Sequence, residues 1–329
     1  MVTIRRPTRT SRIGARTPPK QRGDSERSAT SMEYVRTVPR HLVHRHAVAE
    51  VFVTDYRFEP EAAYEVGIQL PPAHRIFDTS SGHHDPLSVA EAFRQAVVLL
   101  CHTRYHIPSH HSLLMETFSL NMLGSHGIPT TSAPLAFDLT VNKLSYRDDA
   151  VSGVDVSGTL SDGSKDIARC NAVARGVSPD GYRRIRRGRE NQYPSRRTTP
   201  PGSVTVRPGR VGRLSEPDVL ISANDARRVM FCDPDPQNSA LLDHPVDHIP
   251  GMVVFEAARQ AVRYRSGNPA AQIHTLSAVF PQFTEWETPC EISTSVLAAS
   301  AQEPTRYCIR FTQDDALTAE LELSVEDRS

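Results

Sequence analysis

One heptapeptide occurs twice in this chain of 329 residues, as EAFRQAV at 91–97 and as EAARQAV at 256–262. Flanking positions keep the same spacing: Leu87 matches Met252, Val89 matches Val254, His83 matches His248 and Asp78 matches Asp243. Self-similarity at a fixed spacing is the sequence signature of a repeated structural unit. We therefore predict that the two halves of the chain share one architecture, although shared architecture does not by itself mean shared chemistry.

Each copy of the heptapeptide lies in the same succession of predicted elements. A β-branched stretch comes first, followed by a turn-rich segment and a long helix. Alternating apolar and polar residues after the helix then predict antiparallel strands. The β-branched stretches are 48–53 and 219–222, and the later runs cover 113–123, 135–144, 151–160 and 166–177 in the first half and 272–280, 291–297, 305–311 and 317–325 in the second.

The helix predicted from residue 86 to about residue 105 is apolar on most of its circumference, with Phe93, Val97 and Leu100 on one side and Leu99 on another. Such a helix has to be enclosed by other elements. One enclosed helix followed by consecutive antiparallel strands describes a sheet curled around a central helix, which is the hot dog fold. We therefore predict an α+β protein with a tandem (double) hot dog fold, although other α+β arrangements are also compatible with the sequence.

The charged residues divide the chain into segments. Residues 1–40 hold ten Lys or Arg and three Asp or Glu, and residues 179–213 hold ten Arg and two acidic residues, whereas the whole chain has a formal net charge of zero. Both basic segments are rich in Pro, Ser, Thr and Gly and bury too little apolar surface to offset the entropy of ordering. We predict a disordered basic tail over 1–40 and a flexible Pro/Arg-rich linker over 179–213, with hot dog domains at 41–178 and 214–329.

Composition excludes several classes of protein. No apolar run approaches the roughly 20 residues of a membrane span, and the N-terminus lacks the apolar region of a secretory signal. The five cysteines are far apart and form no CxxC pair, which argues against a zinc site or a disulfide framework. We expect a cytoplasmic protein without metal or cofactor. Because the basic segments lack interleaved aromatic residues, we do not expect nucleic acid as a partner, whereas acidic acyl carrier proteins remain candidates.

Each enclosed helix carries one polar stripe formed by a Glu, an Arg and a Gln. These residues are Glu91, Arg94 and Gln95 in the first helix and Glu256, Arg259 and Gln260 in the second. In one interpretation, Glu and Arg three positions apart form a structural ion pair. In the other, a carboxylate half-buried against apolar walls has a raised pKa and acts as a general base near neutral pH. If both carboxylates were packed away with no cavity beside them, the catalytic interpretation would be lost and only the duplicated scaffold would remain.

A His-rich loop precedes the second helix, with the sequence DHPVDHIPGM at 243–252. His244 and His248 therefore come close to the backbone N–H groups of Gly251 and Met252, which a helix N-terminus leaves without intrahelical partners. Such N–H groups polarise a carbonyl as an oxyanion hole does.

The equivalent loop of the first half lacks Pro-Gly. It reads SSGHHDP at 80–86, with His83 in the loop and Asp85 as a candidate N-cap. This asymmetry predicts either one competent site in the second half, headed by Glu256 and Arg259, or one site shared by the two halves.

The second helix and its loop resemble those of β-hydroxyacyl-ACP dehydratases, which are hot dog enzymes that act on acyl thioesters. Pro250-Gly251, Glu256 and Gln260 match their P-G-x4-E-x3-Q spacing. In those enzymes a loop His and the helix carboxylate perform the chemistry. The loop here is two residues shorter, so His244 is only an approximate counterpart of that His.

A closer resemblance covers nearly all of 40–329. The chain has VHR at 43–45 with AEVF at 49–52, GHHDP at 82–86 with ExxRQ at 91–95, and DHPxDHxPGM at 243–252 with ExxRQ at 256–260. In this order and separation the blocks resemble the AfsA family, which comprises actinomycete synthases of γ-butyrolactone and related furan signals.

The resemblance implies an acyltransferase that moves a β-ketoacyl group from an acyl carrier protein to the hydroxyl of dihydroxyacetone phosphate. The product, a phosphorylated β-ketoester, closes to a butenolide and leads to a signalling lactone or furan. The expected roles are general base for Glu256 or Glu91, thiolate protonation or carboxylate orientation for His244 or His248, phosphate binding for Arg259 and Arg94, and further substrate contacts for Gln260, Gln95, Gly251, Met252 and His83.

Two other functions remain open. The fold also supports dehydratases, hydratases and thioesterases on acyl thioesters. A non-catalytic sensor of acyl ligands, with basic arms that bind DNA, is the third possibility.

Overall fold

The computed structural model describes residues 32–58, 64–77, 82–124, 127–131, 133–190, 192–197, 199–299 and 303–326. Residues 1–31 of the predicted tail lie outside these ranges, as does Asp78. The helices are α1 (Pro86–Thr103), α2 (Pro179–Arg186) and α3 (Gly251–Ser266), with short 3-10 helices η1 (Arg40–Val43), η2 (Val48–Glu50), η3 (Pro208–Val211) and η4 (Glu216–Asp218). The strands are β1 (Val53–Phe58), β2 (Tyr64–Ile68), β3 (Ser112–Met122), β4 (Leu135–Arg147), β5 (Ala150–Ser161), β6 (Asp166–Val177), β7 (Val204–Thr205), β8 (Ile221–Asn224), β9 (Val229–Cys232), β10 (Gln272–Val279), β11 (Cys290–Ala298), β12 (Thr305–Gln313) and β13 (Ala316–Glu326).

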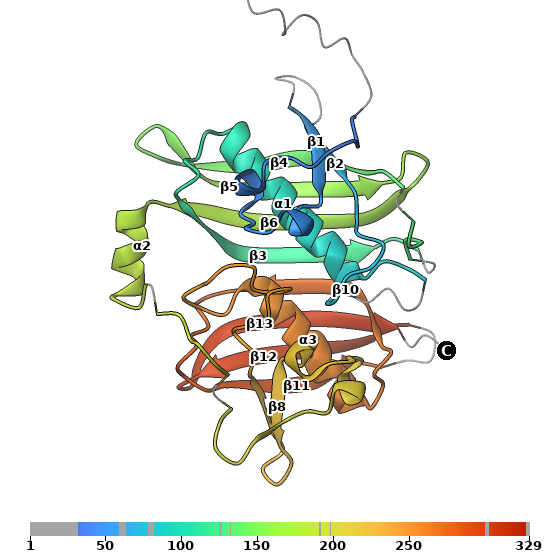
Figure 1. Ribbon diagram of the computed structural model, residues 1–329, viewed down its shortest axis with the longest axis vertical. Coiled ribbons are helices and arrows are strands. Elements are labelled where there is room, and N and C mark those ends of the chain that lie inside the picture. Colours follow the sequence, from blue (N-terminus) through green and yellow to red (C-terminus); the bar gives the residue numbers. More distant parts are fainter. Residues whose placement is uncertain are drawn as a thin grey trace, which may run out of the picture. The chain divides into compact units, whose positions relative to one another are not determined.

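Across the described residues the strands form one antiparallel sheet in which β3 and β10 are neighbours at the centre (Figure 1). Leu120 of β3 pairs there with Leu276 of β10. Outward from this junction the first half runs β3-β6-β5-β4-β2-β1, and the second half runs β10-β13-β12-β11-β9-β8. Corresponding strands occupy corresponding places on the two sides, so the predicted duplication is confirmed.

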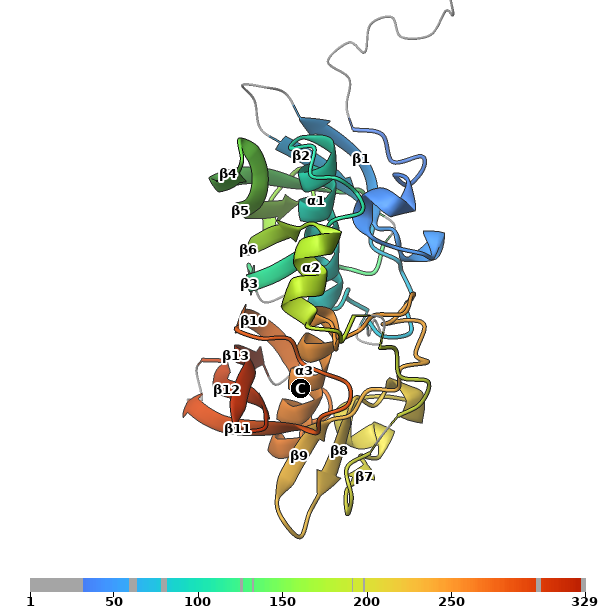
Figure 2. The ribbon, with the colours of Figure 1, turned by 90° about the vertical axis from the view of Figure 1, so that its left-hand side faces the viewer.

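Helices α1 and α3 are enclosed on all sides. Asp85 caps α1 by accepting a hydrogen bond from the backbone N–H of Leu87, and Pro86 occupies the first turn, where its missing N–H costs nothing. Helix α3 ends at Gly267, whose φ of 70° suits the left-handed position after a helix. Each helix lies between the sheet and the N-terminal segment of its own half (Figure 2). The predicted tandem hot dog fold is confirmed.

The structure corrects two sequence predictions. The stretch 48–53, predicted as β-branched strand, begins with the 3-10 helix η2, and β1 starts only at Val53. The segment 179–213, predicted as a flexible linker, contains α2 and two buried side chains, Arg186 and Arg213. The burial of these arginines could not be predicted from the sequence, because each forms ion pairs with carboxylates that are distant along the chain. No helix in the described ranges has the length and apolar character needed to cross a membrane.

Candidate functional site

Glu91 lies at the centre of a buried hydrogen-bond network in the first half. Its side chain is 1% exposed. Arg45 donates to Oε1 from Nε at 3.0 Å and approaches it with Nη2 at 2.7 Å. Arg94 donates to Oε2 of Glu91 from Nε at 2.8 Å and to Oε1 from Nη2 at 2.7 Å. Gln95 donates to Oε1 at 2.7 Å and also to the carbonyl of Glu50 at 2.7 Å, so both oxygens of Glu91 are occupied.

Glu256 repeats this network in the second half. Arg213 donates to Oε1 of Glu256 and Arg259 donates to Oε2, each from Nε at 2.9 Å. Each arginine donates a second hydrogen bond from Nη2 to the same oxygen. Gln260 donates to Oε1 at 2.6 Å. The network then crosses between the halves, because Arg259 Nη1 donates to Asp85 Oδ2 at 2.6 Å. Glu256 and Arg259 are both fully enclosed.

The paired guanidinium groups keep both helix carboxylates ionised. Burial raises the pKa of Glu91, but Arg45 and Arg94 outweigh burial and lower it to about 2. The pKa of Glu256 is lowered in the same way, since its two arginines outweigh the effect of burial. Of the two interpretations, the structural ion pair is therefore favoured over the raised pKa, and a carboxylate with a depressed pKa and no open side is a poor general base.

Sequence reasoning missed Arg45 and Arg213, which lie far from the helices along the chain. The signal was nevertheless present as a second repeated motif, V-x-R-x4-[E/D]-V, at 43–51 and 211–219. Helices η1 and η3 lead into the two arginines, and the residues after them, His44 and Gly212, are both left-handed. The duplication therefore includes the N-terminal segment that closes over each helix.

A cleft of about 1470 Å³ is lined by residues of both halves and of α2. Five of the predicted site residues line it, namely His244, His248, Gly251, Met252 and Arg94. The others, Glu91, Glu256, Arg259, Gln95, Gln260 and His83, are not part of its wall. The predicted grip of Arg259 on a phosphate is not available in this structure, because its guanidinium is 1% exposed and bonded to two carboxylates.

Two histidines in the cleft wall each have an adjacent carboxylate. His244 Nδ1 lies 2.6 Å from Asp243 Oδ1, and His248 Nδ1 lies 2.8 Å from Asp247 Oδ1. A carboxylate only accepts hydrogen bonds, so Nδ1 carries a proton and Nε2 is the nitrogen left to exchange a proton with a substrate. The side chains are 29% and 24% exposed. Each pair has the arrangement of a His–Asp general base.

Asp243 connects the first dyad to the N-terminal half. It accepts hydrogen bonds from the backbone N–H groups of His46 at 2.7 Å and Ala47 at 3.2 Å. Burial raises the pKa of Asp243, but the hydrogen bond with His244 and the charge of Arg45 outweigh burial and lower it. The imidazole of His244 also stacks on that of His46, with ring centroids 4.5 Å apart.

Asp247 connects the second dyad to α2. Tyr182 of α2 donates its hydroxyl to Asp247 at 2.7 Å, and Arg186 donates from Nε at 3.0 Å. Burial raises the pKa of Asp247, but bonds from His248 and Tyr182 lower it to about 2. Arg186 also donates two hydrogen bonds of 2.8 Å to Glu285. Two residues of the segment predicted as a linker therefore form hydrogen bonds with Asp247, the residue that orients His248.

The two helix N-termini differ in their capping and in whether they line the cleft. Asp85 caps α1, so the first turn of that helix is occupied. In α3 the N-cap is Pro250, and among the described residues no side chain caps the helix. Gly251 and Met252 line the cleft. The helix start that lines the cleft is thus that of the second half, and because Arg45 and Arg94 of the first half also line it, the cleft corresponds to the alternative of one site shared by the two halves.

Positive charge lies beside the first dyad. Arg94 is 22% exposed and uses Nε and Nη2 for Glu91, and among the described residues its Nη1 makes no hydrogen bond. Arg45 also lines the cleft. His44, on the same wall, has a pKa lowered to about 3 by burial, by His102 and by Arg94, so it is neutral. Within the described ranges, no three His, Cys, Asp or Glu residues are grouped so that they could hold a metal ion.

The family model and the similar sequences agree on one family. The A-factor biosynthesis hotdog domain (AfsA) matches the chain over residues 28–178 and 195–325, which contain the two halves of the sheet. A 2-oxo-3-(phosphooxy)propyl 3-oxoalkanoate synthase of Streptomyces virginiae is 32% identical over 280 residues, which cover 85% of this chain and 94% of the relative. A synthase of the same name from Streptomyces coelicolor is 30% identical over 283 residues, covering 85% and 88%. Among solved structures, an acyl-ACP thioesterase from Bacteroides thetaiotaomicron aligns with a TM-score of 0.44 and 8% identity over 80% of this chain and 97% of that one.

Proposed function

This chain belongs to the AfsA family of A-factor biosynthesis hotdog proteins, and from that premise we propose that it is an acyltransferase of γ-butyrolactone-type signal biosynthesis. The name of its relatives describes an ester between a 3-oxoalkanoic acid and dihydroxyacetone phosphate. The reaction we propose forms that ester from a β-ketoacyl thioester. The acceptor oxygen attacks the thioester carbonyl, the C–O bond forms, the C–S bond breaks, and the hydroxyl proton passes to the leaving thiolate.

We assign the proton transfers to the two dyads rather than to the helix glutamates. His244 lies on the side of the cleft that holds Arg94 and Arg45, which suit the phosphate of the acceptor. We therefore propose that His244 takes the proton from the acceptor hydroxyl. His248, held against α2 through Asp247, would give the thiolate a proton from Nε2 of its imidazolium form, and the proton gained by His244 would return to His248 through solvent before the next turnover.

The N–H groups of Gly251 and Met252 are the proposed oxyanion hole. They are the first two of a helix without a side-chain cap, and partial positive charge accumulates at a helix N-terminus. A donor aimed at a developing oxyanion contributes about 10²-fold or more to the rate. The observation that carries the proposed function is that this uncapped helix start and two carboxylate-backed histidines line the same cleft.

The donor is proposed to be a β-ketoacyl group on acyl carrier protein, and dihydroxyacetone phosphate the acceptor. Both substrates belong to the metabolism of the cytoplasm, where we expect the protein to act. Leu113, Met115 and Phe280 in the cleft wall offer apolar surface to the acyl chain.

The test combines β-ketoacyl carrier protein with dihydroxyacetone phosphate and identifies the product by mass spectrometry. We expect the phosphorylated β-ketoester, or the butenolide formed from it, together with free carrier thiol in equal amount. Release of the free 3-oxo acid, with no consumption of the phosphate ester, would instead indicate a thioesterase and contradict the proposal.

Variants then test the dyads. His244→Asn and His248→Asn should each lower kcat by about 10²-fold or more, because each removes a proton-transfer group. His83→Asn is the matched control, since His83 is the counterpart of His248 in the first half and lies outside the cleft wall. Full activity in both dyad variants would remove the two histidines from the mechanism.

A further inference from the structure

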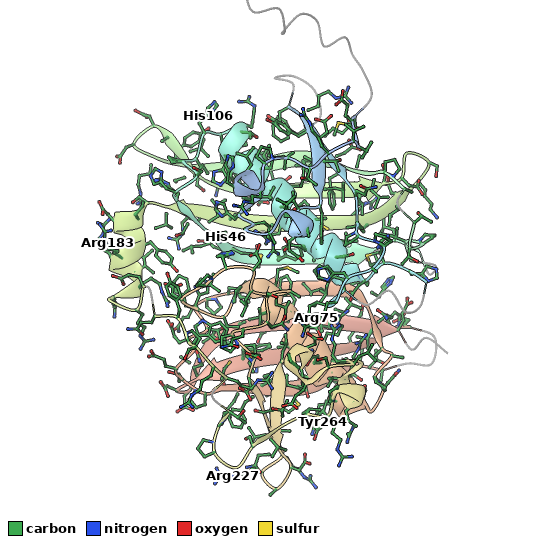
Figure 3. All side chains as sticks on the ribbon, viewed as in Figure 1. His46, Arg75, His106, Arg183, Arg227 and Tyr264 are labelled. Carbon is green, nitrogen blue, oxygen red and sulfur yellow. The ribbon has the colours of Figure 1, made fainter. Side chains whose placement is uncertain are left out.

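A cluster of exposed arginines surrounds one edge of the cleft. We call it the α2 surface, and it comprises Arg183, Arg184, Arg187 and Arg189 with the exposed apolar side chains of Ile185 and Tyr193. Figure 3 shows Arg183 on α2. All of these residues except Arg184 are part of the cleft wall. The surface is therefore at the entrance that a substrate would use.

Much of the charge on the α2 surface is not neutralised by the protein itself. Arg183 pairs with Asp180, and Arg189 Nη1 lies 3.4 Å from Glu285. Arg184 and Arg187 form no ion pair within the described part of the chain. A cluster of arginines in which two have no ion-pair partner among the described residues, beside exposed apolar side chains, is suited to an acidic protein surface.

The α2 surface is also rigidly connected to the chemistry. Arg186, on the buried side of α2, donates to Asp247 from Nε and to its backbone carbonyl from Nη2 at 2.9 Å. Its guanidinium also lies 4.4 Å from the centre of the Phe283 ring. Tyr182 holds the other oxygen of Asp247. A partner bound to α2 is thus held at a fixed position relative to His248.

We propose that the α2 surface is the docking site of the acidic carrier protein that delivers the acyl thioester. This inference rests on the proposed function and deepens it by naming the donor-recognition surface. The arginines bind the acidic face of the carrier, Ile185 and Tyr193 supply apolar contact, and the phosphopantetheine arm enters the cleft beside His248. Nucleic acid fits less well, because the surface is short and borders a cleft rather than following an extended groove.

The test uses Arg184→Glu/Arg187→Glu, which reverses the two arginines that have no ion pair. For an acyl carrier protein loaded with a 3-oxooctanoyl group, the Kd and KM should rise by about tenfold or more. With 3-oxooctanoyl-N-acetylcysteamine, which carries no protein, the rate should equal that of the unmodified enzyme. The effect should shrink as salt is raised from low to physiological concentration.

Arg227→Glu/Arg228→Glu is the matched control, because these exposed residues lie at the β8–β9 turn and give the same change in net charge. The inference is overturned if both double variants bind the carrier equally, if the α2 variant loses activity with both donors, or if a DNA duplex binds the α2 surface and the carrier does not. Direct measurement of carrier Kd separates this inference from the proposed function. If the carrier binds in a way that depends on the α2 arginines but no acyl group is transferred, the proposed acyltransferase function is contradicted and the docking inference is not.

Discussion

The two guanidinium groups around Glu256 lower the pKa of this side chain and outweigh the effect of its burial. Arg213 and Arg259 occupy both of its oxygens, and the side chain is 1% exposed. The carboxylate therefore neutralises Arg213 and shares the neutralisation of Arg259 with Asp85. A group in such a network is required for stability, whether or not it resembles a catalytic residue in sequence.

Replacing this carboxylate separates a structural role from a catalytic one. Glu256→Gln should lower the free energy of unfolding by about 3 to 5 kcal/mol, because it removes the carboxylate that pairs with the buried guanidinium of Arg213 and leaves Arg259 with Asp85 alone. At temperatures where the variant remains folded, it should keep most of its transfer activity. Urea denaturation and acyl transfer measured on the same preparation check both expectations.

Glu291→Gln is the control for this prediction. Glu291 is exposed on β11, so its substitution should change the free energy of unfolding by no more than about 0.5 kcal/mol. A Glu256→Gln variant with unchanged stability and no activity would restore the glutamate as the general base.

At the scale of the elements, the start of α3 is packed against the wall of the cleft. A Cβ atom added to Gly251 would lie 2.3 Å from Cε of Met115 and 3.3 Å from Cζ of Phe280. All three residues line the cleft. The glycine therefore allows the helix start and the apolar wall to approach each other closely.

Gly251→Ala should displace the flexible Met115 side chain and change the space left for the acyl chain. We expect kcat/KM to fall by about tenfold for long acyl donors and less for short ones. The double variant Gly251→Ala/Met115→Ala should recover the long-chain activity, because it removes the clashing atoms. Rates with a series of acyl lengths check this, and an equal loss at every length would show that the helix start was disturbed instead.

The elements that sequence reasoning identified are those with a periodic pattern. The runs predicted at 135–144 and 305–311 correspond to β4 and β12, because one face of each strand packs on the core and the other faces outward. Helix α2 was missed because its packing depends on one buried arginine, and a sequence full of arginines has no apolar periodicity.

The site was predictable only in part for a similar reason. His244, His248 and Gly251 were found because a loop before a helix places them together along the chain. The pairing of Arg45 with Glu91, or of Arg259 with Asp85, joins residues far apart in sequence. Sequence spacing identifies Glu91 as a buried carboxylate, but it does not reveal that Arg45 pairs with it. Burial alone would raise the pKa of Glu91, whereas the paired arginines lower it.

At the scale of the whole molecule, the two halves are joined by the sheet and by buried charges. The pairing of β3 with β10 makes the sheet continuous, and Asp85 at the start of α1 accepts from Arg259 of α3. Arg213 also donates to the carbonyl of Ile76 at 2.5 Å. Each half therefore completes hydrogen bonds of the other, and we expect one cooperative unfolding transition.

Asp85→Asn tests this coupling, because Asn still caps a helix but no longer pairs with Arg259. Trp286, the only tryptophan, lies in the second half and reports its unfolding by fluorescence. The variant should lower the midpoint of the Trp286 transition although the substitution is in the first half, and the circular dichroism transition should move with it. Two separate transitions, with that of Trp286 unchanged, would contradict the coupling.

Acid stability follows from the same buried network. The folded pKa values of Glu91 and Asp247 are lowered to about 2, and those of Asp85, Asp243 and Glu256 are also lowered. A group whose pKa is lower in the folded state stabilises the fold above its ordinary pKa and loses that contribution as pH falls through the folded value. The free energy of unfolding should therefore be nearly constant around neutral pH and fall steeply between the ordinary carboxyl pKa of about 4.5 and a pH of about 2.

Urea denaturation from pH 7 to pH 3 measures this dependence. Glu91 alone accounts for roughly 3 kcal/mol of the neutral-pH stability if its folded pKa is near 2. Asp85→Asn should make the slope with pH shallower, since it removes one of the contributing carboxylates. Raised salt should change the curve little, because these ion pairs are buried and screened weakly. Stability that increased on acidification would instead mean that the helix carboxylates bind protons more tightly when folded, and their role as general bases would have to be reinstated.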